Sequence, residues 1–152
     1  MDFALAAPFI KGITYVLTTM AATTPTAGKP YLKTGATAMG DVTGLVGMTG
    51  AKTGSISISF DKASAIAIVK GMLGDDIQDL LQDVKDTVGE ITNMVSGQAR
   101  AGLAEMGIVM QGSTPTVIMG DNHSVGHATK APIMAIPFTT DAGKFTIEFC
   151  FQ

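Results

Sequence analysis

The sequence predicts an α+β fold in which long helices pack on an antiparallel-rich sheet. The segment "GSISISF" (54–60) alternates as a strand does, with Ile56, Ile58 and Phe60 on one face and serines on the other. The stretch from Asp75 to about Met106 carries apolar residues at helical spacing and reads as one long helix. "TGSISISF" and "AGKFTIEF" are alike, because each is a turn glycine followed by an alternating strand downstream of a helix. We therefore expect two similar halves, each a helix plus a three-stranded unit.

The first half opens with a helix from Phe3 to Met20, which tolerates Pro8 near its start. A loop (21–28) follows, and then three strand-like pieces, "PYLKT", "DVTGLVGM" and "GSISISF". The turn "GAKTG" joins the last two of these strands. Asp61 is the predicted N-cap of a shorter helix, "KASAIAIVKGML", which Gly74 ends.

The second half opens with the long helix. Asp75 and Asp76 are predicted to begin it, because negative charge suits the positive end of the helix dipole, and Gly107 is predicted to end it. We then expect strands at "GIVMQGS" and "PTVIMG", a polar loop "DNHSVGHATK", and strands "APIMAIPF" and "KFTIEFCF" joined by "TTDAG". No linker divides the chain, so residues 1–152 are predicted to form a single domain.

Composition excludes several classes of protein. Hydrophobic residues make up 46% of the chain and charged residues 15%, which is ample material for a core. The net charge is −3 and Arg100 is the single arginine, so no basic patch for nucleic acid is predicted. A lone cysteine, Cys150, allows no internal disulfide and indicates a reducing, cytoplasmic location. Its apolar neighbours in "EFCFQ" predict a buried thiol on a strand.

The N-terminal segment is apolar but does not read as an export signal. It lacks a basic start, carries Asp2, and has Lys11 in the middle of its apolar run. No segment approaches the run of about 18 uninterrupted apolar residues that a membrane span needs. We therefore predict no association with a membrane.

One narrow stripe of the long helix is polar. At about 100° per residue, and measured from Asp86, Glu90 lies at about 40°, Asn93 at about −20° and Gly97 at about 20°. The opposite side is apolar, with Val84, Val88, Ile91 and Val95 between about 140° and 200°, continued by Ile77, Leu81 and Leu103. Because the apolar side must bury against the sheet, the polar stripe must face solvent or a partner.

The polar stripe has two possible interpretations. It is either an ordinary solvated helix surface or a functional site. Gly97 costs the helix about 1 kcal/mol relative to Ala, and Gly89 flanks the same stripe, which suggests that something comes close. Asn is a poor helix former, so Asn93 in mid-helix calls for a reason. Its uncharged carboxamide can hold a water without repelling a phosphoryl group, whose hydrolysis depends on positioning and electrostatics. Glu90, one turn away, can pair with a partner's lysine and fix the register of docking.

The segment "KDTVGEITNMVSGQAR", followed by "GSTPTVIMG", resembles the CheX/CheC family of chemotaxis phosphatases. The motif of that family is an acidic residue or Ser, then Glu, Asn and a downstream Pro, and Asp86, Glu90 and Asn93 match its spacing. Pro115 follows Asn93 after 21 residues, one fewer than is usual in the family, which places the difference in the loop rather than the helix. "APFIKGITYVL" is similar to the family's first helix, so the resemblance covers most of the chain.

The resemblance implies a phosphatase whose substrate is a phosphorylated CheY-like receiver domain. Asn93 would orient the attacking water in line with phosphorus, and Glu90 would form a salt bridge with the receiver's active-site lysine. Asp86, Met94 and Gly97 would contact the receiver. The protein would need no cofactor or metal of its own, since Mg²⁺ would come with the receiver.

A single motif is similar to the CheX type, which implies a homodimer, rather than to CheC, which carries two motifs. The alternative is a non-catalytic module of the same fold that binds a receiver or another signalling protein.

Other combinations of residues give weaker indications. His123 and His127 are four apart, but Gly126 and the loop composition argue against a helix there, and no third metal ligand is near in sequence. "TAGKP" and "GAKTG" pair glycine with lysine but lack the spacing of a phosphate-binding loop. The ten methionines are typical of core filling. We therefore predict neither a metal site nor a nucleotide site.

Overall fold

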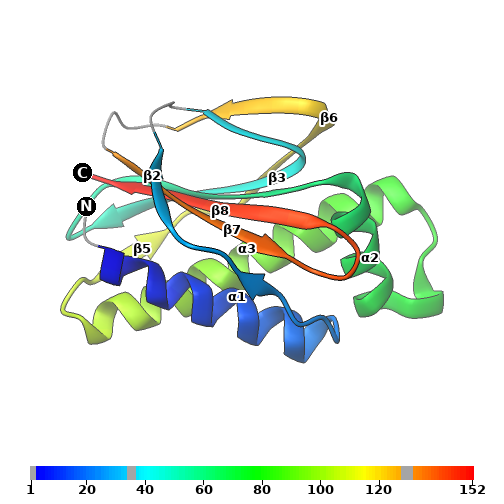
Figure 1. Cartoon of the computed structure of the whole chain (residues 1–152), viewed down its shortest axis with the longest axis horizontal. Helices are drawn as coiled ribbons and strands as arrows, with labels where there is room; N and C mark the ends of the chain where they lie inside the picture. Colours follow the sequence, from blue (N-terminus) through cyan, green and yellow to red (C-terminus); the bar gives the residue numbers. More distant parts are fainter. Residues whose placement is uncertain (1–2, 34–36, 128–131) are drawn as a thin grey trace.

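The computed structural model describes residues 3–33, 37–127 and 132–152 (Figure 1). The helical elements are η1 (Phe3–Leu5), α1 (Ala6–Met20), α2 (Lys62–Leu73), η2 (Gly74–Asp76) and α3 (Leu80–Glu105). The strands are β1 (Thr26–Ala27), β2 (Tyr31–Lys33), β3 (Thr37–Gly50), β4 (Gly54–Phe60), β5 (Met110–Gly112), β6 (Thr116–Gly126), β7 (Ile133–Thr139) and β8 (Lys144–Phe151).

The strands form one curled, wholly antiparallel sheet, which confirms the predicted α+β class. Its order is β1-β7-β8-β4-β3-β5, with β2 also paired to β7 and β6 also paired to β3. Figure 1 shows α1 and α3 side by side along one face of the sheet, with β6 and part of β3 arching over the other face. The helices are therefore segregated to one face, as expected for this class.

The two predicted halves meet at the centre of the sheet. β4 and β8, the two strands whose sequences are alike, pair over their full lengths from Gly54↔Phe151 to Phe60↔Phe145. Each is flanked by the preceding strand of its own half, β3 and β7. The halves also exchange strands, because β2 of the first half pairs with β7, and β6 of the second pairs with β3. Within the described residues, the second half has no helix that corresponds to α2 of the first half.

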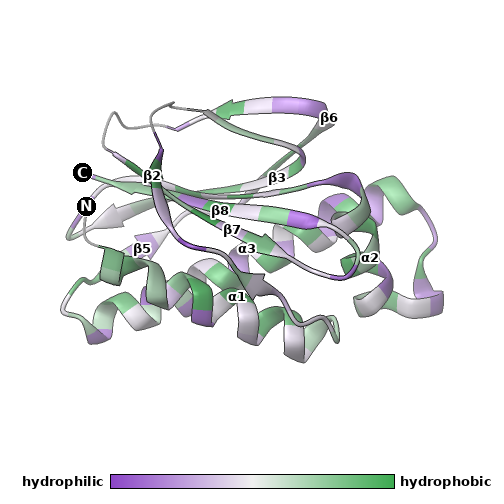
Figure 2. Cartoon of the chain, viewed as in Figure 1, coloured by the Kyte–Doolittle hydropathy of each residue, from purple (hydrophilic) through white to green (hydrophobic). Residues whose placement is uncertain are grey.

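The core lies between the helices and the inner face of the sheet. Ile56, Ile58 and Phe60 of β4 are fully buried there, on the apolar face that the alternation predicted. The aromatic rings of Phe9 on α1 and Phe149 on β8 stack with centroids 4.2 Å apart, which ties α1 to the sheet. Figure 2 shows apolar residues along α1 and α3, with hydrophilic residues on β6 and in the segment between α2 and α3.

The local stop and start signals mostly act as predicted. The Asp61 carboxylate caps α2 by accepting a hydrogen bond from the Ser64 backbone N–H at 2.7 Å. Gly74 and Gly107 follow the ends of α2 and α3 with φ values of 56° and 83°, a conformation that favours glycine.

The predicted start of the long helix is wrong. Asp75 and Asp76 lie in the short 3₁₀ helix η2, and Ile77 is extended with ψ 121°. The helix begins at Leu80, where Asp79 is the N-cap and accepts a hydrogen bond from the Gln82 backbone N–H. Acidic residues favour the start of a helix, and the segment holds three of them, Asp75, Asp76 and Asp79. The helix starts after the last of the three, about one turn later than predicted.

The predicted polar loop is also wrong over its first part. Residues 121–126 continue β6, because β3 begins at Thr37, earlier than predicted, and pairs with residues 123–126. A bulge between Gly40 and Val42 allows this pairing, with Asn122 at φ 52° donating its backbone N–H to the Asp41 carboxylate. Residues 128–130 of the predicted loop lie outside the described residues, as do Thr34 of "PYLKT" and Ala131 of "APIMAIPF".

By length and composition alone, one described helical stretch, Phe3–Met20, could cross a membrane. Six residues of α1 are buried in the core, however, and the helix packs against α3. Core packing of this kind is sufficient to account for its apolar character. Cys150 is fully buried, as its neighbours predicted.

Candidate functional site

The predicted site lies on the outward face of α3. The helix is unbroken from Leu80 to Glu105, and Asp86, Glu90 and Asn93 are all exposed on it. Glu90 and Asn93 are three residues apart, so their side chains project from the same side, about one turn from each other.

The opposite side of α3 is buried as predicted at Val84, Val88, Ile91, Val95 and Leu103. The expected orientation of Glu90 and Asn93 is therefore confirmed.

Neither side chain is engaged within the protein. Among the described residues, Glu90 and Asn93 have no hydrogen bond or ion pair from their side chains. Asp86 differs, because its Oδ1 accepts a hydrogen bond from Gln82 Nε2 at 2.8 Å on the same helix. An exposed carboxylate and an exposed carboxamide, both without internal partners, are available to a molecule that docks on this face.

A close contact with the sheet fixes α3 next to the site. Gly44 of β3 lies under Thr92, and a Cβ on Gly44 would stand 1.9 Å from Thr92 Oγ1 and 2.8 Å from Thr92 Cβ. The Thr92 hydroxyl is turned back along the helix and donates to the Val88 carbonyl at 2.7 Å. Thr92 precedes Asn93, so this contact sets how deeply the helix sits at the point where the carboxamide emerges.

The two glycines near the polar stripe have different surroundings. A Cβ on Gly89 would stand 3.3 Å from Val117 Cγ2, so the neighbour that comes close there is β6 of the same chain. A Cβ on Gly97 would meet only Arg100 Nη2, at 3.9 Å. Met94, predicted to contact a partner, is half-buried and packs against the core. Gly97 therefore remains the open glycine beside Asn93.

The two histidines do not converge on a common point. His123 Nε2 hydrogen-bonds Thr43 Oγ1 at 2.7 Å, whereas His127 contacts Ser55 Oγ through Nδ1 at 2.9 Å and Glu148 through Nε2 at 3.1 Å. In residues 3–33, 37–127 and 132–152, no group of three His, Cys, Asp or Glu side chains is placed to hold a metal. The two histidines thus make separate contacts with the sheet, His123 from β6 to β3 and His127 just after β6 to β4 and β8.

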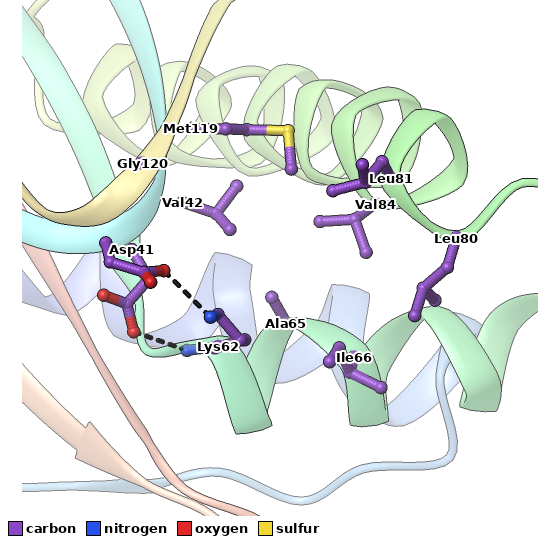
Figure 3. Close-up of a pocket in the computed structure, with 11 residues that line it drawn as sticks. Asp41, Val42, Lys62, Ala65, Ile66, Leu80, Leu81, Val84, Met119 and Gly120 are labelled. Atoms are coloured by element: carbon purple, nitrogen blue, oxygen red, sulfur yellow. Dashed lines mark hydrogen bonds and ion pairs between the residues drawn. The ribbon is translucent and has the colours of Figure 1, made fainter.

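Sequence reasoning missed a pocket at the start of α3. It is about 450 Å³ in volume and lies between α2, α3 and the strands β3 and β6 (Figure 3). Leu81 was predicted to continue the buried face of the helix, but the residue is 72% exposed and lines this pocket. The helix starts late and overhangs the sheet here, so its apolar side has no strand to cover it. Glu90 and Asn93 do not line the pocket.

The rim of the pocket is polar and ordered. Asp41 accepts hydrogen bonds from the backbone N–H groups of Lys62 and Asn122, and these bonds hold the pKa of its carboxyl below the usual value. Lys62 Nζ lies 2.9 Å from Asp121 Oδ1, and both side chains are largely exposed. The charged side chains on this rim therefore already have partners within the chain.

The chain is similar to known chemotaxis proteins. The family model described as "Chemotaxis phosphatase CheX" matches residues 42–139. "CheY-P phosphatase CheX" from Thermotoga maritima is 28% identical over 113 residues, which are 72% of this chain and 73% of that protein.

Solved structures agree with the family match. A chemotaxis protein CheX from Desulfovibrio desulfuricans is 58% identical, with a TM-score of 0.95, covering 99% of this chain and all of that one. The CheX of a CheX-CheY-BeF3-Mg complex from Borrelia burgdorferi has the same fold, with a TM-score of 0.76 at 23% identity and coverage of 99% and 98%.

Proposed function

Because this chain belongs to the CheX family of chemotaxis phosphatases, we propose that it hydrolyses the aspartyl phosphate of a CheY-like receiver domain. The observation that carries the proposal is the pairing of Glu90 and Asn93 on the exposed face of α3, one turn apart and without side-chain partners among the described residues. A relative of the same fold occurs in a complex with CheY, BeF3 and Mg, which supports a receiver as the partner.

In this proposal Asn93 positions the nucleophile. Its carboxamide accepts one hydrogen bond from a water and donates another, so the water's lone pair can be aimed at phosphorus without adding negative charge to the site. The water oxygen forms a bond to phosphorus while the bond from phosphorus to the aspartyl oxygen breaks. The products are the free aspartate of the receiver and inorganic phosphate, and the surplus proton passes to solvent.

Glu90 and the partner supply the remaining charges. We propose that the Glu90 carboxylate pairs with the receiver's active-site lysine and so fixes the register in which Asn93 enters. The receiver would bring Mg²⁺, which neutralises charge on the phosphoryl oxygens. Asp86 and Gly97 complete the contact, and we expect the protein to act in the cytoplasm as a homodimer.

The test is a hydrolysis assay with candidate phosphorylated receivers, following loss of phosphate with and without this protein. Asn93→Ala should slow the accelerated loss on the order of 10²-fold, because the water is no longer positioned. Glu90→Lys should weaken docking and raise KM. Gln98→Ala and Glu105→Lys are matched controls, because they make the same chemical changes at exposed positions of α3 outside the polar stripe.

Two results would contradict the proposal. If Asn93→Ala keeps the wild-type rate on every receiver that responds, the role of Asn93 is wrong. If the protein binds a phosphorylated receiver but accelerates no phosphate loss, it is a non-catalytic binding module of the same fold.

A further inference from the structure

The single arginine of the chain lies on the same face of α3 as the candidate site. Arg100 follows Asn93 by seven residues, which turns it by only about 20° around the helix and carries it about 10 Å along the axis. It therefore extends the polar stripe beyond Gly97, toward the C-terminal end of the helix. Glu90 lies toward the other end, one turn after Asp86 and about 15 Å from Arg100 along the axis.

The guanidinium of Arg100 is held in a defined place. Its Nε donates a hydrogen bond to Ser96 Oγ at 3.3 Å, and Ser96 is buried. Gly112 of β5 leaves the room that the guanidinium occupies, because a Cβ there would stand 3.1 Å from Nε and 3.3 Å from Cζ. A Cβ on Gly97 would stand 3.9 Å from Nη2, an ordinary contact distance. Arg100 is therefore half-buried and ordered, and its guanidinium lies beside Ser96, which is about a turn from Asn93.

This ordered cation has no anionic partner within the described residues. The ion pairs there join Lys33 to Glu148, Lys62 to Asp121 and His127 to Glu148. A guanidinium carries five N–H donors, of which Arg100 uses one for Ser96. An arginine is well suited to bind a carboxylate or a phosphate, because its planar donors fit such groups in a bidentate way. The free donors of Arg100 lie on the two Nη atoms.

We propose that Arg100 is a second docking residue, which binds a carboxylate side chain on the surface of the receiver. This inference rests on the proposed function, because it concerns how the protein would recognise the receiver. The polar stripe carries negative charge at Glu90 and positive charge at Arg100, so it demands a partner that is positive at one end and negative at the other. Such complementary charges fix the direction in which a partner lies across a helix.

A carboxylate fits the position better than the phosphoryl group does. The attacking water and the phosphorus must both stand at Asn93, whereas the Nε–Ser96 bond holds the guanidinium a turn further along. An acidic side chain beside the receiver's phosphorylation site can reach Arg100 while Asn93 keeps the water. The contact therefore strengthens docking without taking part in the chemical step.

The proposal is tested by calorimetric binding to a receiver activated with BeF3⁻ and Mg²⁺, and by steady-state kinetics on the phosphorylated receiver. Arg100→Gln should weaken binding about tenfold and raise KM to match, with kcat within about twofold of wild type. Arg100→Lys keeps the positive charge but loses the planar pair of N–H donors. Its affinity for the receiver should therefore lie between those of wild type and Arg100→Gln. Lys144→Gln, at an exposed lysine of β8 on the sheet, is the matched loss of one positive charge and should change nothing.

Charge reversal identifies the receiver's group. Arg100→Glu should abolish measurable binding, and one Asp→Arg or Glu→Arg change near the receiver's phosphorylation site should restore it. Unchanged binding by Arg100→Gln, a fall in kcat with KM unchanged, or no restoring receiver variant would each overturn the proposal. Binding is measured separately from phosphate loss, so the role of Arg100 and the phosphatase activity can fail independently.

Discussion

The buried cluster around His127 predicts that the protein loses stability in mildly alkaline solution. The imidazole is 1% exposed and contacts Glu148 Oε1 at 3.1 Å, while Lys33 Nζ lies 2.8 Å from the other oxygen, Glu148 Oε2. Burial by itself lowers the pKa of His127. Hydrogen bonds to Cys150 and Glu148, with the electrostatic attraction to both, outweigh burial and raise that pKa to about 9.

The sign and size of the effect follow from this pKa. The folded protein binds the proton more tightly than the unfolded chain, whose histidine pKa is 6.5. The stabilisation is therefore complete below about pH 6.5 and disappears as the pH rises through about 9. A rise in pKa of this size corresponds to about 3 kcal/mol, which is a large part of the stability of an ordinary domain.

Glu148 acts in the opposite direction at low pH. Burial raises the pKa of its carboxyl, but hydrogen bonds from His127 and Lys33 and their positive charges lower it below 4.5 overall. The stabilisation from Glu148 is therefore present above about pH 4.5 and is lost as the solution becomes more acidic. Together the two groups predict a maximum of stability between about pH 4.5 and 6.5.

The assay is urea unfolding followed by circular dichroism at a series of pH values from 5 to 9.5, under reducing conditions that protect Cys150. The wild-type free energy of unfolding should fall by about 3 kcal/mol between pH 6 and 9.5. His127→Gln lowers stability throughout but should remove this dependence on pH. Parallel curves for wild type and His127→Gln would refute the reasoning, because the loss would then come from other groups.

Two further predictions concern contacts that position the helices. Gly44→Ala should lower the free energy of unfolding by about 2 kcal/mol, because its Cβ would overlap Thr92, and Thr92→Ala should recover part of the loss in a double-mutant cycle. Asp61→Ala should cost more than the roughly 1 kcal/mol expected for Asp79→Ala, because Asp61 accepts two backbone hydrogen bonds of 2.7 and 3.1 Å whereas the cap at Asp79 is 3.4 Å long. Urea unfolding of each variant checks both, and equal costs for the two caps would contradict the second.

Periodicity predicted the two faces of α3 because that helix has one side in the core and one in solvent. Val88 and Ile91 fall on the buried side and Glu90 on the exposed side, so the sequence alone orients the candidate site. The same reasoning failed for Leu81, because spacing gives the direction of a side chain and not the extent of the sheet beneath it. Near the start of α3, the side that faces inward elsewhere faces a pocket.

The strand β6 was half missed for a related reason. Most of its residues are exposed or half-buried, since it pairs with β3 alone in the described part of the chain and arches away from the core. Strands of this kind do not alternate between apolar and polar residues, so 121–126 looked like a loop. The contacts of His127 and Arg100 were equally out of reach, because they depend on which strand passes beside them and in which register.

The same helix serves the core with one side and the candidate site with the other, so a change in packing can affect activity separately from stability. Gly44 contacts Thr92, and the next residue, Asn93, is the proposed water-orienting group. A loss of about 2 kcal/mol from Gly44→Ala leaves nearly all molecules of a typical domain folded. A shift of about 1 Å in α3, however, can cost on the order of 10²-fold in a reaction that depends on positioning. If Gly44→Ala reduces kcat far more than its folded fraction explains, while Asp61→Ala at similar stability does not, the depth of α3 against β3 is part of the catalytic geometry.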